Sequence, residues 1–206
     1  MALFEPTACQ VDVAAGTMSG ATGTYRKRLA DLAGLYGDEG AFAAAVQAGG
    51  NTIVYDVADF RPSARSGDLI FGITRMSAGC IGEEYYMTRG HIHAVADRPE
   101  IYYGQAGQGL MLMESPEGEM RVIEMRAQTI CYVPPFWIHR SVNTGTADFV
   151  MIFSYPADSG QDYGIIERAG GMRHRVMQGG PKGWQLVGNK DYRPRSTEAV
   201  AAVMQP

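Results

Sequence analysis

The stretch GHIHAVADRPEIYY, residues 90–103, decides the fold that this sequence predicts. Alternate side chains of an extended strand share a face, so His91 and His93 point the same way while Ile92 points into the opposite layer. The polar residues and the proline that follow favour a turn. That turn would bring Glu100 back towards the two imidazoles and add a carboxylate to them.

A third histidine, His139, follows the apolar run PPFWI about forty residues later. Three neutral nitrogens and one carboxylate suit a first-row divalent cation and leave coordination positions open for water or substrate. The predicted metal ligands are His91, His93, Glu100 and His139. His174 is the remaining histidine, and we expect it to be structural because an isolated histidine more often fills a hydrogen-bonding role than a metal site.

The 206 residues, with 46% hydrophobic content, are enough for one substantial core and few for two complete domains. The 26 glycines and 10 prolines are spread between short apolar runs, which is typical of many strands joined by turns. We expect one domain: an N-terminal arm with short helices at 1–50, a barrel at 51–190 and a tail at 191–206.

Charge and cysteine content exclude several classes of function. A net charge of −4 and a pI near 5.6 argue against a general nucleic-acid binder, which needs a clustered basic surface. Three widely spaced cysteines (9, 80 and 131) indicate neither a disulfide framework nor a thiolate zinc site. The sequence shows no secretion signal and no apolar run of roughly 20 residues. We therefore expect a cytoplasmic protein without a membrane segment.

Two helices are predicted near the N-terminus. Apolar residues recur at helical spacing over 24–36, and Gly37 is a natural stop. Asp38 is a suitable N-cap for a second helix that runs to Ala48. Residues 1–22 show no clear period, and we expect an extended arm that lies on the domain or on a second subunit.

After residue 51 the pattern becomes that of strands, with no convincing long helix. The expected strands are 52–57, 69–75, 84–88, 100–104, 110–114, 119–126, 129–133, 139–143 and 149–155. The tetrapeptide SPEG at 115–118 is typical of a type I turn and predicts a hairpin. The runs 110–113 and 149–153 are apolar on both faces, so they belong inside a sandwich or at a subunit interface, and we expect a homodimer. Regularly spaced short strands indicate an all-β jelly roll or small barrel with a central cavity.

The metal-site residues resemble the two sequence patterns of the cupins. The first pattern has an H-x-H pair followed by Glu and Gly, and the second has Pro, then His, then Asn. These patterns correspond here to His91, His93, Glu100 and Gly107, and to Pro134, His139 and Asn143. The sequence departs from the patterns in two ways: His93 and Glu100 are further apart than usual, and Gln128 and Phe136 replace the glycines usual before and after the proline.

The longer spacing is similar to that of archaeal-type, cupin-fold glucose-6-phosphate isomerases, which the sequence resembles from about Tyr55 to Gly164. The strings that carry this resemblance are TRGHIH (88–93), EIY (100–102), YVPPFWIHR (132–140) and YPADSGQDYG (155–164). The last two strings are far more specific than the general cupin patterns. The resemblance implies a cupin double-stranded β-helix, or jelly-roll barrel, with short N-terminal helices.

The same resemblance implies a site and a reaction. The enzyme would interconvert glucose 6-phosphate and fructose 6-phosphate, in glycolysis and gluconeogenesis, with Fe2+ as the expected ion and Ni2+, Mn2+ or Zn2+ as substitutes. Glu100 and Tyr155 are the expected catalytic residues. The residues expected to bind the sugar phosphate are Thr74, Thr88, Gly90, Tyr102, Tyr155 and Tyr163, with Tyr55 as an addition. Gln161 stands where archaeal members carry a histidine, and glutamine cannot titrate.

Two questions stay open from the sequence. Hydrogen moves between C2 and C1 either through an enediol, with Glu100 as the base, or as a direct hydride shift that needs no strong base. The site residues also fit another iron cupin enzyme, such as a dioxygenase or decarboxylase, or a non-catalytic sugar-binding cupin, because fold alone does not fix function. The tyrosine-rich string at 155–164 favours the isomerase.

Overall fold

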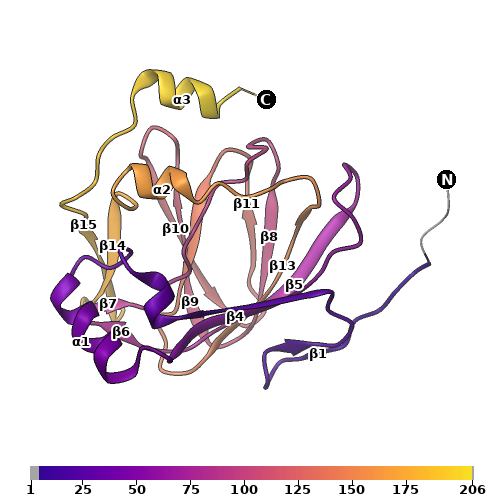
Figure 1. Ribbon diagram of the computed structural model, residues 1–206, viewed down its shortest axis with the longest axis horizontal. Coiled ribbons are helices and arrows are strands. Elements are labelled where there is room, and N and C mark those ends of the chain that lie inside the picture. Colours follow the sequence, from indigo (N-terminus) through magenta and orange to yellow (C-terminus); the bar gives the residue numbers. More distant parts are fainter. Residues whose placement is uncertain (1–4, 206) are drawn as a thin grey trace.

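Antiparallel β-strands form most of the chain, and the computed structural model describes residues 5–205 (Figure 1). The largest sheet has six strands in the order β11-β8-β13-β5-β4-β3. Its strands are β3 (Gly23–Arg28), β4 (Ile53–Phe60), β5 (Leu69–Met76), β8 (Glu100–Ala106), β11 (Ile130–Val133) and β13 (Phe149–Pro156). This sheet joins β3, from the part of the chain before residue 51, to five strands of the predicted barrel segment.

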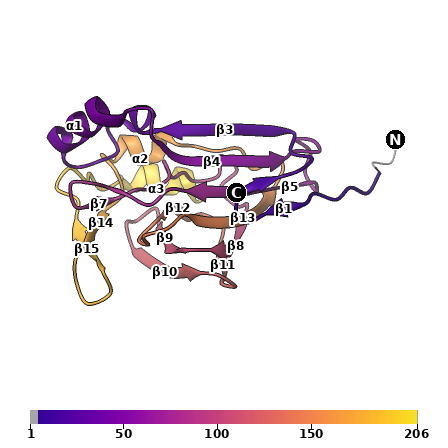
Figure 2. The ribbon, with the colours of Figure 1, turned by 90° about the horizontal axis from the view of Figure 1, so that it is seen from below.

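Two smaller sheets lie against one face of this sheet (Figure 2). The three-stranded sheet has the order β10-β9-β12, with β9 (Gln108–Glu114), β10 (Met120–Arg126) and β12 (Ile138–Val142). The four-stranded sheet has the order β15-β14-β7-β6, with β6 (Cys80–Ile81), β7 (Glu84–Tyr85), β14 (His174–Gln178) and β15 (Trp184–Gly188). Buried side chains from the facing sheets form one large hydrophobic cluster. The predicted all-β cupin jelly roll is confirmed.

Short elements complete the chain. They are β1 (Val11–Asp12), β2 (Thr17–Met18), a 3-10 helix η1 (Leu29–Leu32), α1 (Glu39–Gly49), α2 (Gly164–Arg168) and α3 (Thr197–Val203). Met18 of the arm is buried against Ile73 and Val150, so part of the arm lies on the outer face of the six-stranded sheet. Residues 1–4 of the expected arm lie outside the described residues. No helix of residues 5–205 is long and apolar enough to cross a bilayer.

The helix predicted over 24–36 is wrong. Residues 23–28 form β3, which pairs antiparallel with β4 and places Tyr25 opposite Val57. The 3-10 helix η1 follows, and its Leu29 and Leu32 are buried as their spacing suggested. An i, i+3 pair fits a 3-10 turn as well as an α-helix, and the free edge of β4 gives the preceding residues a strand partner. The second predicted helix is confirmed as α1, with the Asp38 side chain accepting a hydrogen bond from the Ala41 N–H at 2.8 Å.

Most of the expected strands are present. The SPEG turn joins β9 to β10, with Glu114 opposite Met120. The segment 84–88 is shorter than expected, because only Glu84 and Tyr85 form a strand. Residues 91 and 92 form isolated bridges rather than a regular strand, yet the predicted alternation holds because Ile92 is buried in the core opposite the imidazoles. Strands β14 and β15 were not predicted.

The two apolar runs are buried within a single chain. Residues Leu110–Met113 of β9 and Phe149–Met151 of β13 are each at most 4% exposed, while Phe153 is 6% exposed and Ile152 is half-buried. Both faces of these strands are therefore covered by this chain's own sheets and arm, without a second subunit.

Two positions at which the cupin pattern usually has glycine keep a left-handed backbone conformation here. Gln128 and Phe136 each have a φ of 70°, and they are the non-glycine residues with positive φ in the described part of the chain. Their N–H groups donate to the carbonyls of Gly104 at 2.8 Å and Ala96 at 2.7 Å. A left-handed conformation costs an ordinary residue about 1 kcal/mol, so these hydrogen bonds hold the backbone where the side chain disfavours it.

Candidate metal centre and substrate cavity

Three segments bring the predicted metal ligands together. His91 is bridged to His139, with backbone hydrogen bonds of 3.0 and 2.9 Å between them. Glu100 begins β8, next to the turn that follows His93. Arg98 in that turn forms an ion pair of 2.9 Å with Asp158, which ties the loop to the segment after β13. Three separate segments of the chain thus hold the four donors in place.

The donor atoms converge on the Glu100 carboxylate. Glu100 Oε2 lies 3.0 Å from His139 Nε2, 3.3 Å from His93 Nε2 and 3.8 Å from His91 Nε2. Ligand atoms of His91, His93 and Glu100 all lie within 4.8 Å of one another. All four side chains are buried, with at most 9% of each residue exposed.

Backbone carbonyls set the tautomers of two of these histidines. His93 Nδ1 lies 2.7 Å from the carbonyl oxygen of Arg98, and His139 Nδ1 lies 3.0 Å from that of Trp137. An Nδ1–H that donates to a carbonyl leaves Nε2 with its lone pair, which is the arrangement typical of metal-binding histidines. Both Nε2 atoms therefore face Glu100 as electron-pair donors.

The electrostatics of this cluster suit a cation. Burial and the neighbouring His139 lower the pKa of His91 well below its usual value, so His91 is neutral at physiological pH. Burial raises the pKa of Glu100, but the adjacent imidazoles of His139 and His93 outweigh this effect, so the pKa lies below its usual range. His91 Nε2 and His93 Nε2 are buried without a hydrogen-bond partner. Unpaired buried donors or acceptors are costly, and a divalent cation would satisfy both. The residues present fit a metal.

A cavity of about 60 Å³ opens beside His91 and Glu100. Every residue expected to bind the sugar phosphate lines it, namely Thr74, Thr88, Gly90, Tyr102, Tyr155 and Tyr163, together with Tyr55. Burial raises the pKa of Tyr155 and of Tyr55 to about 12, so both are phenols at neutral pH. The pKa of Tyr102 rises well above its usual value through burial and the adjacent Glu100.

Sequence reasoning missed several residues of the cavity wall. Asp59 and Arg61 line it, and Arg61 binds Asp59 through Nε at 2.9 Å and Nη2 at 2.6 Å. Arg61 Nη2 also lies 3.5 Å from the Tyr155 hydroxyl. Arg89 and Tyr25 line the cavity as well. The D-F-R string of β4 carries no motif; only the strand alternation that places Tyr55, Val57 and Asp59 on one face would have suggested it.

Gln161 and His174 have different surroundings. Gln161 lines the cavity and accepts a hydrogen bond from the Tyr163 hydroxyl. His174 lies on β14, in the four-stranded sheet, and does not line this cavity. His174 is therefore separate from the candidate metal donors, although its Nδ1 is buried without a hydrogen-bond partner among the described residues.

Fold and site together define a cupin in which three buried histidines and one buried glutamate lie together beside a polar cavity. The family model described as glucose-6-phosphate isomerase (GPI) matches residues 26–195. Since this match spans most of the sequence, the chain belongs to that glucose-6-phosphate isomerase family.

Curated relatives agree with this family. A putative glucose-6-phosphate isomerase 1 of Rhizobium meliloti is 60% identical over 201 residues, which are 98% of this chain and 94% of the relative. A glucose-6-phosphate isomerase of Thermococcus gammatolerans is 42% identical over 175 residues, 85% of this chain and 91% of the relative. Among solved structures, an oxalate oxidase in complex with glycolate is 15% identical, with a TM-score of 0.45 over 53% of this chain and 55% of that one. The last likeness bears on neither substrate nor reaction.

Proposed function

We propose that this chain is a metal-dependent aldose–ketose isomerase that interconverts glucose 6-phosphate and fructose 6-phosphate, a step of glycolysis and gluconeogenesis. Family membership and the names of the relatives support the reaction. The observation that carries the proposal for the site is the pair of buried imidazole nitrogens, on His91 and His93, that lack a hydrogen-bond partner beside the cavity.

The proposed metal ligands are His91, His93, Glu100 and His139. Three nitrogens and one carboxylate suit Fe2+, which we propose as the native ion, with Ni2+, Mn2+ or Zn2+ as substitutes. The bound ion would supply a Lewis acid next to the sugar oxygens O1 and O2. The hydrogen bonds from the imidazoles to backbone carbonyls would keep the ligand set in place before the ion arrives.

Glu100 and Tyr155 are the proposed catalytic residues. Among the described residues, two carboxylates line the cavity; Asp59 is engaged by Arg61, which leaves Glu100 as the candidate base. In the enediol route Glu100 takes the C2 proton and returns it at C1, and in the hydride route it only binds. Tyr155 stays protonated, since its pKa is about 12, and donates a hydrogen bond to a substrate oxygen. Deuterium from solvent enters the product only by the enediol route.

Six residues are proposed to bind the phosphorylated hexose, and Tyr55 assists them. They are Thr74, Thr88, Gly90, Tyr102, Tyr155 and Tyr163. Their support is that all of them line one cavity with the metal donors His91 and Glu100. Gln161 holds the Tyr163 hydroxyl and does not titrate, so ring opening here would not depend on a proton from position 161.

A homodimer, one domain and a cytoplasmic location complete the proposal. Exposed apolar side chains of β8 and β11, namely Ile101, Ile130 and Tyr132, lie at the edge of the six-stranded sheet and offer an interface. One domain is supported by β3 of the N-terminal part pairing with β4. The tail is tied to the barrel by an ion pair of 2.7 Å between Arg195 and Glu114. The three free cysteines fit a reducing compartment.

A coupled assay with fructose 6-phosphate tests the function. Protein loaded with Fe2+, and separately with Ni2+ or Mn2+, should form glucose 6-phosphate, and a chelator should abolish the activity until metal is restored. No turnover with any of these ions would overturn the isomerase assignment and turn attention to oxidative or decarboxylating cupin chemistry.

A further inference from the structure

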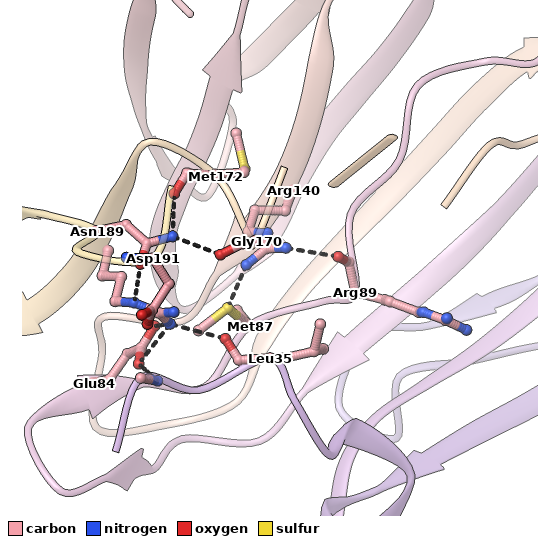
Figure 3. A network of polar contacts seen from close by, with 11 residues as sticks. Leu35, Glu84, Met87, Arg89, Arg140, Gly170, Met172, Asn189 and Asp191 are labelled. Carbon is pink, nitrogen blue, oxygen red and sulfur yellow. Dashed lines mark hydrogen bonds and ion pairs between the residues drawn. The ribbon is translucent and has the colours of Figure 1, made fainter. Parts of the chain in front are cut away.

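Arg140 is a buried cation that lies directly behind the cavity wall. It is 6% exposed and forms no ion pair with any residue of the described chain. Burial lowers its pKa to about 10, so it remains charged at neutral pH. Its Nη1 donates to Met87 Sδ at 2.7 Å and its Nη2 to the Arg89 carbonyl oxygen at 2.8 Å, while Nε has no partner (Figure 3).

Two other arginines, whose side chains are 14% and 6% exposed, have carboxylate partners. Arg175 binds Glu84 at 3.0 Å, and Arg195 binds Glu114 at 2.7 Å. Glu84 attracts Arg140, but Arg175 occupies its carboxylate. An isolated buried charge is expensive unless something compensates it. The missing compensation around Arg140 points to a partner that this chain does not provide.

The hydrogen bond from Arg140 fixes the direction of one peptide group. The carbonyl and N–H of a trans peptide point in opposite directions, so holding the Arg89 carbonyl turns the Gly90 N–H away from Arg140. Gly90 lines the substrate cavity, and its N–H has no hydrogen-bond partner within residues 5–205. The side chain of Arg89 points away from this contact (Figure 3).

At Gly90 no side chain separates Arg140 from the cavity. Its φ is +74°, and a Cβ added there would lie 2.9 Å from Arg140 Cβ and 3.0 Å from Arg140 Nε. The guanidinium group is therefore close enough for its field to reach the cavity through Gly90. Thr88 adds a second donor, because its Oγ1 already accepts from the Ser141 N–H at 3.0 Å and keeps its hydroxyl hydrogen free.

We propose that Arg140 is a positioning residue for the substrate's phosphate: it holds the Arg89–Gly90 peptide so that the Gly90 N–H faces the anion, and its charge favours a dianion in front of Gly90 and Thr88. The inference rests on the proposed isomerase function for the identity of the ligand. A backbone amide in the left-handed region beside a buried cation is a suitable anion-binding group.

The first test compares Arg140→Met, Arg140→Lys and Arg195→Met. Losing a charge-assisted interaction predicts that Arg140→Met weakens inorganic phosphate binding in calorimetry, and raises KM for fructose 6-phosphate, by about 10- to 100-fold. Its kcat should change less than about fivefold, since the metal centre is untouched. Arg140→Lys should recover most of the affinity. Arg195→Met removes an equally buried guanidinium elsewhere and should leave phosphate affinity unchanged.

A folded Arg140→Met variant with wild-type phosphate affinity would overturn the proposal. Should that variant not fold, the zinc-loaded wild-type protein decides by NMR: the Gly90 amide resonance should shift on titration with inorganic phosphate, and an unmoved Gly90 resonance overturns the proposal. Phosphate binding that shifts the Gly90 resonance and weakens in Arg140→Met, in a protein without isomerase activity, would support the role of Arg140 and contradict only the proposed function.

Discussion

Two buried glutamates on strands that follow each other in the sequence have opposite surroundings. Glu100 begins β8 and faces three imidazoles, of which two have unpaired Nε2 atoms. Glu114 ends β9 and receives three donors from the chain: the Arg195 guanidinium at 2.7 Å, the Tyr192 hydroxyl at 3.1 Å and the Arg173 N–H at 2.6 Å. Both glutamates are at most 3% exposed. Burial alone therefore does not identify a carboxylate as part of a functional site. The groups that surround the carboxylate do.

The largest effect should come from Glu100→Gln. The amide keeps the shape of the side chain but loses the negative charge that a divalent cation needs. We expect loss of bound metal and a fall in isomerase activity of about 1,000-fold or more, as for the removal of an essential group. Metal content by elemental analysis and the coupled assay measure both. A variant that keeps its full metal content and activity would contradict the assignment of different roles to Glu100 and Glu114.

The second comparison separates the metal histidines from the fourth histidine. His139→Ala removes an imidazole whose Nε2 lies 3.0 Å from Glu100, so metal affinity should drop by at least about 100-fold. His174→Ala on β14 should retain metal and activity, because His174 lies outside the cavity. Dialysis against a graded chelator series gives both affinities. Equal losses in the two variants would refute the ligand assignment.

Glu114→Gln should affect stability rather than metal binding. The substitution leaves Arg195 buried without its counter-charge, and breaking a buried ion pair costs about 3–5 kcal/mol. We expect the urea midpoint to fall while the folded protein keeps its metal. Metal loss in this variant at a temperature where it is folded would show that the two clusters are coupled.

The smallest loss is expected for the double variant Glu114→Gln with Arg195→Met. Removing both charges leaves no orphaned cation. The Gln oxygen can still accept from the Arg173 N–H, and the amide NH2 in place of the other carboxylate oxygen can donate to the Tyr192 hydroxyl oxygen. The double variant should therefore be more stable than Glu114→Gln alone, with a net loss of about 1–2 kcal/mol from wild type. Denaturant unfolding of the four proteins in the cycle measures this coupling. A double variant less stable than the single one would mean that Arg195 stabilises the tail independently of Glu114.

The local patterns that predicted the convergence of the candidate metal ligands depend on nearest neighbours along the chain. The alternation of His91 and His93 and the turn before Glu100 are of this kind, and the structure places these residues around one point. The segment 24–36 failed because its helical spacing competed with the free edge of β4. Local spacing alone does not reveal such an edge.

The roles of isolated residues depend on tertiary neighbours. Arg61 lies at the cavity, with its Nη2 3.5 Å from the hydroxyl of Tyr155 on β13, and Arg140 is unpaired because Glu84 binds Arg175 instead. The sequence around Arg61 and Arg140 predicts neither arrangement. Strands β14 and β15 were missed for a similar reason: these short strands, HRVMQ and WQLVG, pair with each other and, through one residue, with β7.

The backbone conformation of Gln128 and Phe136 has a consequence for how related proteins are found by sequence. Both occupy points where the cupin pattern usually has glycine, yet both retain a φ of 70°. A search that demands the letter G at these points would overlook proteins of this shape, whereas one that asks for the sign of the torsion angle would retrieve them.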